Sequence, residues 1–302
     1  MNTTPSSSSL HGRALVLGGG GSTGNAWLIG VIAGLFDAGL DMTAADLVIG
    51  TSAGSTAAAQ IAGASPTELF SAILATASRQ PTAPVGSDGG RVTARPVSDH
   101  LERTDRIIAA AGDAADMRRR MGAAALGREA GSDGAWQSRW RETVAARLPS
   151  QRWPHRTMLV TAVDAQTGEA AVFDCDSGVD LVDAVAASCS SGSAYRIGDK
   201  RYIDGGYRRN ENADLATGYG RVLVLSPFGG RTRMPLAWGM QLAAQVDELR
   251  GSGSRVETVF PDGSSEHMFG ANAMDPSLRP PAARAGYDQG KVLAGQLTEF
   301  WR

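Results

Sequence analysis

A serine lies in a pattern typical of catalytic nucleophiles. Gly50-Thr51-Ser52-Ala53-Gly54 fits G-x-S-x-G, follows the β-rich run Asp46–Ile49 and precedes the Ala-rich helical run Ser55–Ala62. Glycines on both sides permit a sharp strand-to-helix turn that lifts the hydroxyl clear of a sheet. The helix that begins there favours negative charge at the hydroxyl. Ser52 is therefore the candidate nucleophile for acyl transfer, and Gly50 and Gly54 are the residues that permit its turn.

A second glycine motif lies between the first predicted strand and the first predicted helix. Gly18-Gly19-Gly20-Gly21-Ser22-Thr23-Gly24 has four consecutive glycines, so several backbone N–H groups can converge on one anion. One interpretation is an oxyanion hole. The other is a dinucleotide fingerprint, since Gly19-x-Gly21-x-x-Gly24 fits G-x-G-x-x-G. Dinucleotide binding requires an acidic residue at the end of the second strand, where this chain has Gly50-Thr51-Ser52. The oxyanion hole is therefore favoured.

A serine hydroxyl is a weak nucleophile until a base takes its proton. Among the histidines, His267 has the place near the C-terminus that an α/β-hydrolase requires, which predicts a triad of Ser52, Asp204 and His267. A nucleophile at position 52, however, leaves room for only two preceding strands, which is early for that fold. Asp204 itself ends a short β-type segment and enters the turn Asp204-Gly205-Gly206, a dipeptide pattern that is also typical of ordinary turns.

Three motifs in this order resemble the patatin-like phospholipase family: Gly19–Gly24, Gly50–Gly54 and Asp204–Gly206. The segment Asn210–Ala216 also looks like that family, and the resemblance covers roughly residues 13–225. It implies an α/β fold, a patatin-like three-layer α/β/α sandwich with a mainly parallel central sheet and a helical insertion. It also implies a Ser–Asp dyad without histidine, which suits this chain's few candidate histidines.

The resemblance also implies a role for each matching residue. Ser52 is the expected nucleophile and Asp204 the expected base. The amides of Gly19, Gly20 and Gly21 are the expected oxyanion hole, and the motif-supporting residues are Gly24, Gly50, Gly54, Gly205 and Gly206. Two departures stand out. Thr23 occupies a place where the family usually has Arg or Lys, which changes the charge of the loop. The run Ser188–Ala194 lacks the prolines that are often found there, which bears on the shape of the acyl pocket.

The expected function is that of a lipid acyl hydrolase of the phospholipase A, lysophospholipase or carboxylesterase type, acting through an acyl-enzyme. This scheme needs no metal and no cofactor. The expected partner is a lipid or other acyl ester, with transient contact at a membrane surface. Three alternatives stay open: an esterase that uses His267, a non-catalytic lipid- or nucleotide-binding protein, and an acyltransferase that shares the same dyad.

Hydrophobic periodicity places the elements that position these residues. Strands are predicted at 13–17, 46–49, 157–163, 170–173, 201–203, 221–225 and 255–260, and helices at 24–39, 55–62, 135–147, 179–187 and 282–301. Strands that alternate with helices indicate an α/β fold on a largely parallel sheet. Residues 80–134 differ in composition and carry a basic run, which predicts a helical insertion or lid. The chain is thus expected to form one hydrolase domain, 13–302, after a flexible leader, 1–12.

Composition narrows the class of partner and the compartment. The 302 residues carry a formal net charge of −2, so no global field recruits nucleic acid, and no nucleic-acid partner is expected. Residues 1–12 lack the basic and apolar regions of a signal peptide. A cytoplasmic protein is therefore expected, with leaderless secretion left open. Cys175 and Cys189 are too few for a disulfide framework and are expected to be small buried apolar residues.

Overall fold

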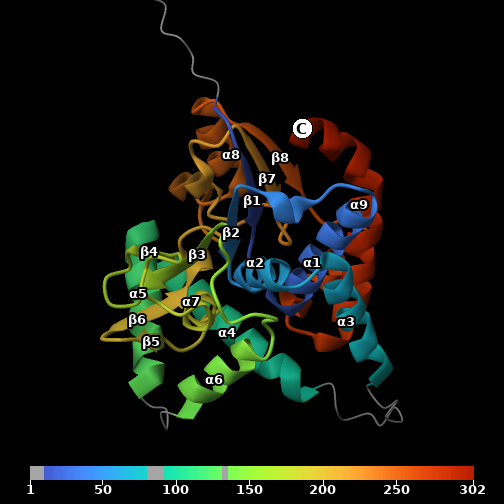
Figure 1. Cartoon of the computed structure of the whole chain (residues 1–302). Coiled ribbons are helices and arrows are strands. Elements are labelled where there is room, and N and C mark those ends of the chain that lie inside the picture. Colours follow the sequence, from blue (N-terminus) through green and yellow to red (C-terminus); the bar gives the residue numbers. More distant parts are fainter. Residues whose placement is uncertain (1–9, 80–90, 131–134) are drawn as a thin grey trace, which may run out of the picture.

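A mixed β-sheet runs through the centre of the molecule (Figure 1). The computed structural model describes residues 10–79, 91–130 and 135–302. The strand order is β5-β6-β3-β2-β1-β7-β8, and β4 pairs with β3. The strands are β1 (Arg13–Leu17), β2 (Leu47–Thr51), β3 (Thr157–Asp164), β4 (Ala170–Phe173), β5 (Tyr195–Ile197), β6 (Lys200–Asp204), β7 (Arg221–Leu225) and β8 (Arg255–Val259). The five neighbouring strands β3-β2-β1-β7-β8 are parallel to one another. The strands β4, β5 and β6 pair antiparallel with their neighbours.

Helices cover both faces of the sheet. They are α1 (Gly21–Asp37), α2 (Ala53–Gly63), α3 (Pro66–Arg79), α4 (Arg91–Ala110), α5 (Ala114–Ala130), α6 (Ala135–Ala145), α7 (Leu181–Ser188), α8 (Leu242–Gly251) and α9 (Arg279–Trp301). Side chains of α1, α2, α7 and α9 form one hydrophobic core with the sheet, and side chains of α8 form a second core on the opposite face. The expected three-layer α/β/α sandwich is confirmed.

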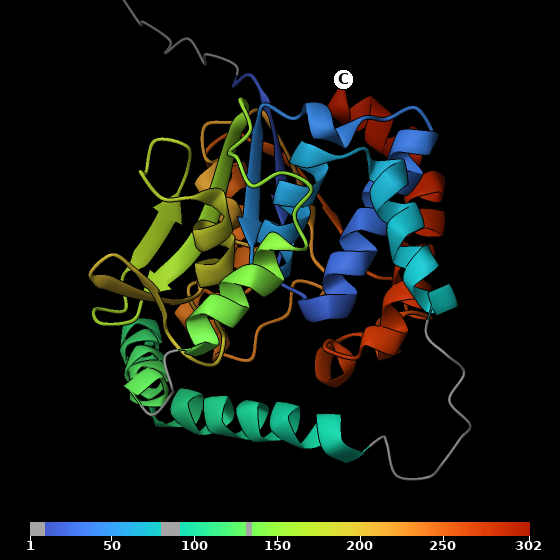
Figure 2. The same ribbon diagram turned by 60° about the horizontal axis from the view of Figure 1, so that its bottom comes forward.

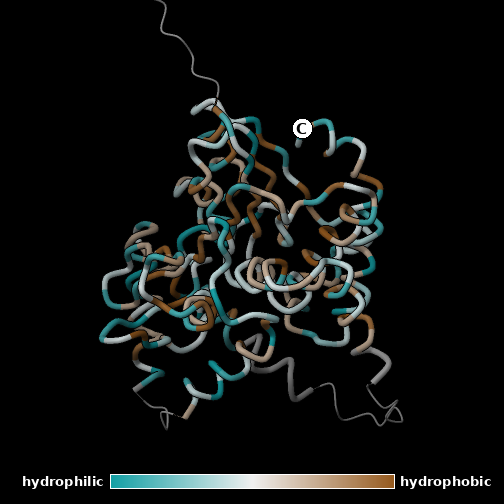
Figure 3. Tube along the Cα trace, in the orientation of Figure 1, coloured by the Kyte–Doolittle hydropathy of each residue, from teal (hydrophilic) through white to brown (hydrophobic). Residues whose placement is uncertain are grey.

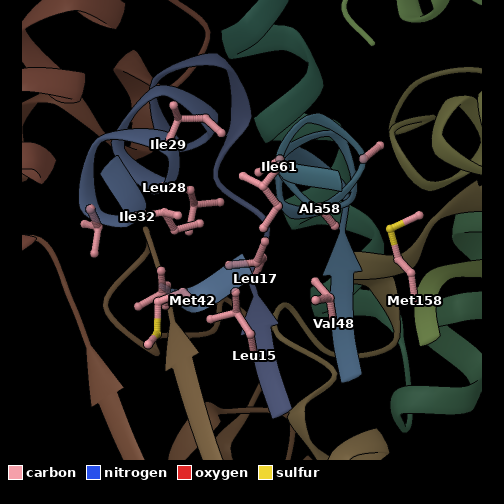
Figure 4. Packing of buried hydrophobic residues seen from close by; sticks show 14 of the residues in the cluster. Leu15, Leu17, Leu28, Ile29, Ile32, Met42, Val48, Ala58, Ile61 and Met158 are labelled. Atoms are coloured by element: carbon pink, nitrogen blue, oxygen red, sulfur yellow. The ribbon is translucent and has the colours of Figure 1, made fainter. Parts of the chain in front are cut away.

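Alternation along the strands explains the two cores. In β1, Leu15 and Leu17 belong to the first core, while Ala14 and Val16 belong to the second. Both faces of this central strand are therefore apolar, as expected for a strand of a parallel sheet covered on both sides. Figure 4 shows Leu15 and Leu17 facing side chains of α1 and α2, among them Ile61. In Figure 3 brown, hydrophobic stretches of the trace run through the region of the sheet that Figure 1 labels β1 and β7.

The sequence expectations differ from the structure in a few places. The strands expected at 13–17, 170–173 and 221–225 have the expected bounds. The short strand β5 and the helix α8 were not expected. The expectation that both cysteines are buried is wrong for Cys175, which is exposed, whereas Cys189 is half-buried. Residues 1–9 of the expected leader, and residues 80–90 and 131–134 of the expected insertion, lie outside the described residues, and the rest of that insertion contains α4 and α5.

The carboxyl edge of the parallel strands gathers the candidate site. Gly50 pairs with Leu17, so the glycine loop after β1 and the serine turn after β2 leave the sheet side by side. On the other side of β2, Thr51 pairs with Thr161 of β3. The next residue of β3, Ala162, pairs with Asp204 at the end of β6. Sheet register thus brings the three motifs to one edge, where ligand sites of open α/β sheets form.

Candidate active site

Ser52 is held in a strained turn at the start of α2. Its backbone has φ +53° and ψ −116°, and Asn212 is the other non-glycine residue with positive φ among the described residues. Such a conformation costs about 1–3 kcal/mol and persists only where the surroundings enforce it. Here the Ser52 N–H donates to Ser188 Oγ at 2.9 Å, and the Ser52 carbonyl accepts from Ser55 Oγ at 2.7 Å and from Cys189 Sγ at 3.1 Å. The turn is fixed from both of its peptide groups.

Gly50 and Gly54 leave no space for a side chain. A Cβ on Gly54 would lie 1.9 Å from the Leu17 carbonyl oxygen, which belongs to the neighbouring strand β1. A Cβ on Gly50 would lie 2.5 Å from Ser55 Cα. Both contacts are with backbone, which cannot swing away. The two glycines of the G-x-S-x-G pattern thus permit the close approach of α2 to the sheet that aims the Ser52 hydroxyl at the carboxyl edge.

Asp204 is a buried carboxyl beside Ser52. Its side chain is 8% exposed, and its Oδ1 accepts from the Gly206 N–H at 2.8 Å. The Ser52 hydroxyl lies within hydrogen-bonding reach of the same carboxyl. Burial raises the pKa of Asp204 from 3.8 to about 6, although the hydrogen bonds from Gly206 and Ser52 act in the opposite direction. A carboxyl with this pKa is a better base near neutral pH than an ordinary aspartate.

The glycine loop lies against the serine turn and begins α1. Gly21 has φ +64°, and a Cβ on it would lie 2.8 Å from the Ala273 carbonyl oxygen. The Gly24 N–H donates to the Gly20 carbonyl at 3.0 Å, which closes the first turn of the helix. Among the described residues, the amides of Gly20 and Gly21 have no acceptor. The Gly19 N–H donates to the Asn210 carbonyl at 3.0 Å, so two of the three expected oxyanion donors are free in this arrangement.

The segment Asn210–Asn212 joins the three motifs, a role that the residue pattern did not reveal. Asn210 Nδ2 donates to the Gly19 carbonyl at 3.3 Å, and the Asn210 carbonyl accepts from the Gly19 N–H. Asn210 therefore binds both backbone polar groups of Gly19. Asn212 Nδ2 lies 3.0 Å from Thr51 Oγ1 and 3.3 Å from the Gly205 carbonyl oxygen. Asn212 is therefore bonded to the residue before Ser52 and to the residue after Asp204.

A second buried carboxyl, that of Glu211, lies under the glycine loop. Its Oε1 accepts from Ser226 Oγ at 2.7 Å and from Asn210 Nδ2 at 2.8 Å, and its Oε2 accepts from Gln245 Nε2 at 3.4 Å. Burial raises the pKa of Glu211, and the hydrogen bonds of these three side chains oppose that rise. A Cβ on Gly18 would lie 3.2 Å from Glu211 Cγ. This carboxyl thus packs against the glycine loop at Gly18 and is hydrogen-bonded to Asn210, Ser226 and Gln245.

An arginine at the start of α9 contacts the turn of α1 that contains position 23, where the family usually has a basic residue. Thr23 is buried, and among the described residues its hydroxyl has no hydrogen-bond partner. Arg279 donates to the Ser22 carbonyl at 2.6 Å and to Asn25 Oδ1 at 3.1 Å. A positive charge therefore still contacts the first turn of α1, although it comes from the far end of the sequence.

Among the described residues, no hydrogen bond joins the His267 ring to Ser52 or Asp204. His267 is exposed, and its Nδ1 lies 3.0 Å from the Ser264 carbonyl oxygen, three residues earlier in the chain. The Asp204 carboxyl instead accepts from the Gly206 N–H, and the Ser52 hydroxyl lowers the pKa of Asp204. This arrangement favours a two-residue site over the triad that includes His267. Within residues 10–79, 91–130 and 135–302, no three His, Cys, Asp or Glu side chains are grouped as metal ligands.

The model of the family described as Patatin-like phospholipase matches residues 15–217, which is more than half of the chain and includes Ser52 and Asp204. The chain belongs to the patatin-like phospholipase family. No curated protein matched it. Two similar solved structures are those of VipD from Legionella pneumophila (14% identity, TM-score 0.44, 95% of this chain and 67% of that chain) and of the type III effector protein ExoU (13% identity, TM-score 0.39, 95% of this chain and 53% of that chain).

Membership of the patatin-like phospholipases supports lipid acyl hydrolysis as the class of activity, and lipid esters as the class of substrate. The matched range ends shortly after the segment Asn210–Asn212, so all the contacts described above between that segment and the glycine loop fall within it. Arg279 lies outside the matched range and contributes its charge from α9. Among the described residues, no helix is long and apolar enough to cross a bilayer.

Proposed function

We propose that this patatin-like phospholipase cleaves carboxylic esters of lipids through a Ser52–Asp204 dyad and an acyl-enzyme intermediate. The observation that carries the proposal is the strained Ser52 turn, whose hydroxyl lies within reach of a buried carboxyl with a raised pKa. Strain at a single polar residue and a shifted base together are typical of nucleophilic sites. The same residues serve an acyltransferase equally well, with an alcohol in place of water in the second step.

The proposed reaction has two steps. Ser52 Oγ attacks the ester carbonyl carbon while Asp204 takes the hydroxyl proton, and the carbonyl oxygen becomes an oxyanion. The alcohol or lysolipid then leaves with the proton from Asp204. In the second step Asp204 takes a proton from water, which attacks the acyl carbonyl, and then returns that proton to Ser52 Oγ as the fatty acid leaves. Asp204 thus acts first as a base, then as an acid, and then repeats both roles, which a pKa of about 6 permits.

The amides of Gly20 and Gly21 are the proposed oxyanion donors. The glycine loop lies next to the serine turn, since a Cβ on Gly54 would meet the carbonyl oxygens of both Leu17 and Gly18. Gly19 has a supporting role in this proposal, because its N–H is bonded to Asn210. Two preorganised N–H donors are sufficient for an oxyanion hole, and each typically contributes 10²–10³ in turnover. The N-terminus of α2 adds favourable electrostatics at Ser52.

A chain-length series of p-nitrophenyl esters, from acetate to palmitate, tests the proposed function with EDTA present. We expect hydrolysis that EDTA does not reduce, with higher kcat/KM for long acyl chains than for acetate, because apolar chain burial stabilises the complex by ~0.8 kcal/mol per CH₂. Equal or faster turnover of acetate would contradict the lipid preference. Loss of activity in EDTA with recovery on adding a metal would contradict the dyad scheme.

The pH profile is expected to follow Asp204. Because burial raises the pKa of this base to about 6, kcat/KM should fall about tenfold for each pH unit below 6, as the carboxyl becomes protonated, and should level off above pH 7. The profile is measured with a neutral p-nitrophenyl ester, so that the substrate does not titrate. A fall in kcat/KM centred near pH 4 would show that the pKa of the Asp204 carboxyl is not raised, and would contradict the buried environment assigned to it.

Replacing His267 by Ala is expected to change kcat/KM by less than about twofold, because the ring is exposed and contacts Ser264. The measurement uses the same ester series and the wild-type protein as reference. A loss comparable to that of removing the nucleophile would restore the triad hypothesis and would reduce Asp204 to an orienting residue.

A further inference from the structure

Basic side chains gather beside the dyad on a part of the chain that the proposed reaction does not use. Figure 2 shows α4 and α5 on the side of the molecule toward which β2 points, which is the side of the site. Three segments contribute: α4 supplies His100 and Arg103, α5 supplies Arg128, and the loop after β7 supplies Arg233. The side chains of Arg128 and Arg233 are exposed, and Arg103 is half-buried.

Hydrogen bonds connect these segments with the base of the dyad. The Asp204 N–H donates to the Ser190 carbonyl at 2.9 Å, and the hydroxyl of Tyr207 donates to the next carbonyl, that of Ser191, at 2.8 Å. Arg128 approaches the following residue, since a Cβ on Gly192 would lie 3.8 Å from Arg128 Nη1. The guanidinium of Arg128 thus lies near Gly192, which is two residues after Ser190, the residue that accepts the Asp204 N–H.

The other two arginines are linked through α4. Arg103 Nη2 lies 3.0 Å from Nδ1 of His100, one turn earlier on the helix. Arg233 Nη2 donates to the Leu101 carbonyl at 2.9 Å, which attaches the loop after β7 to the same turn of α4. Arg233 also pairs with Asp105.

The charges of the three guanidinium groups act on the same two side chains, Tyr207 and His100. The pKa of Tyr207 is raised by burial and by the charge of Asp204, while Arg103, Arg233 and Arg128 oppose that rise. The pKa of His100 is lowered by burial and by the same three arginines. The same three positive charges therefore affect the pKa of both Tyr207, next to the proposed dyad, and His100, on α4.

Acidic groups balance this positive region only in part. Asp105 pairs with Arg233, and Asp99 acts on Arg103, whose pKa is lowered by burial and by Arg128. Among the described residues, Arg128 has no ion-pair partner. Guanidinium groups bind phosphate oxygens through paired, charge-assisted hydrogen bonds. A phosphate suits this region, whereas a quaternary ammonium group is repelled by it.

We propose that Arg103, Arg128 and Arg233 form an anion subsite beside the dyad, which binds the phosphate of acyl-ester substrates whose headgroup carries a net negative charge. This inference rests on the proposed function and refines its substrate class. Esters with an uncharged polar group on the phosphate, or with a free phosphate, are the preferred substrates, and choline esters of the same chain length are disfavoured.

The test compares two monomeric substrates, dihexanoyl phosphatidylglycerol and dihexanoyl phosphatidylcholine, below their micelle concentrations so that no charged interface contributes. We expect the wild type to prefer the glycerol headgroup about tenfold or more in kcat/KM. Arg103→Gln with Arg128→Gln should remove most of that preference, mainly through a higher KM. Turnover of neutral p-nitrophenyl hexanoate should stay within about twofold. Arg120→Gln, on the exposed part of α5, is the matched control and should change neither rate.

A binding measurement separates this inference from the proposed function. Calorimetry should show that the Ser52→Ala protein binds glycerol 3-phosphate. Adding the Arg103→Gln and Arg128→Gln substitutions should weaken this binding about tenfold or more. Inorganic phosphate is the comparison ligand, which reports a site that binds phosphate without the rest of the headgroup. If glycerol 3-phosphate binds but the wild type hydrolyses no ester, the proposed function is contradicted while the anion subsite is still supported. Equal turnover of both lipids, or undiminished binding by the folded double variant, would overturn the subsite.

Discussion

Ser52→Ala and Asp204→Asn are each expected to reduce kcat/KM for p-nitrophenyl esters by ~10³–10⁶, the largest effects that the site predicts. Removing a nucleophile or its base in serine hydrolases costs this much, and the residual rate comes from binding and the oxyanion hole. The two losses should not add in the double variant, because Asp204 acts only on the proton of Ser52.

Neither dyad substitution should unfold the protein. Ser52 is half-buried, and asparagine at 204 keeps the oxygen that accepts from the Gly206 N–H. Circular dichroism and the thermal midpoint are therefore the controls for these variants. Activity of folded Asp204→Asn within tenfold of the wild type would contradict the role of Asp204 as the base.

Gly54→Ala is expected to abolish activity and to destabilise the fold by ~3 kcal/mol or more. The added methyl group would lie 1.9 Å from the Leu17 carbonyl oxygen, so α2 must move away from β1 and carry Ser52 with it. Overpacking of this kind commonly costs 1–3 kcal/mol, and here the obstacle is backbone. Urea unfolding and ester hydrolysis are the measurements.

Gly127→Ala is the matched control for that substitution. Gly127 lies in α5, where a Cβ would meet nothing within 4 Å, so the same chemical change should stabilise the protein by up to ~1 kcal/mol through helix propensity. Its ester hydrolysis should stay at the wild-type level. A Gly54→Ala variant as stable and as active as the Gly127→Ala variant would show that α2 is not held where the structure places it.

The centre of the fold was largely predictable from sequence because its central strands are short, buried and largely apolar. Arg13–Leu17 and Arg221–Leu225 have the bounds that the pattern predicted, since each is a hydrophobic run that ends at a turn signal. The strand Tyr195–Ile197 was missed because three residues carry no periodicity. The helix Leu242–Gly251 was missed because it buries a polar residue, Gln245, in place of an apolar one.

The residues of the site were easier to predict than the contacts that fix them. Ser52 and Asp204 stand in short motifs with a stated chemistry. Asn212 has no such motif, and its acceptors Thr51 and Thr161 are 161 and 51 positions away in the chain. The Gly19 amide likewise meets Asn210 only through the fold. Local sequence therefore indicates which residues are candidates for catalysis, whereas the hydrogen bonds that orient them depend on long-range packing.

The sequence resemblance and the family model agree on the family, and the structure shows which contacts surround the two departures from its usual motifs. The basic residue usual at position 23 is absent, and Arg279 supplies a guanidinium to the same helix turn from α9. The chain before Asp204 lacks the prolines that the family often has, and its residues Ser188 and Cys189 hydrogen-bond the backbone of Ser52 instead. Both departures therefore affect the surroundings of Ser52, the candidate nucleophile.

Covalent trapping of the nucleophile tests the central claim most directly. The wild type, Ser52→Ala and Asp204→Asn are treated with a long-chain alkyl fluorophosphonate, and intact mass and peptide mapping locate the adduct. We predict one adduct per chain on the peptide that contains Ser52, none in Ser52→Ala, and labelling of Asp204→Asn slowed by ~10²-fold or more, since the base must take the serine proton. An adduct on another residue, or undiminished labelling of Ser52→Ala, would contradict the assignment of Ser52 as the nucleophile.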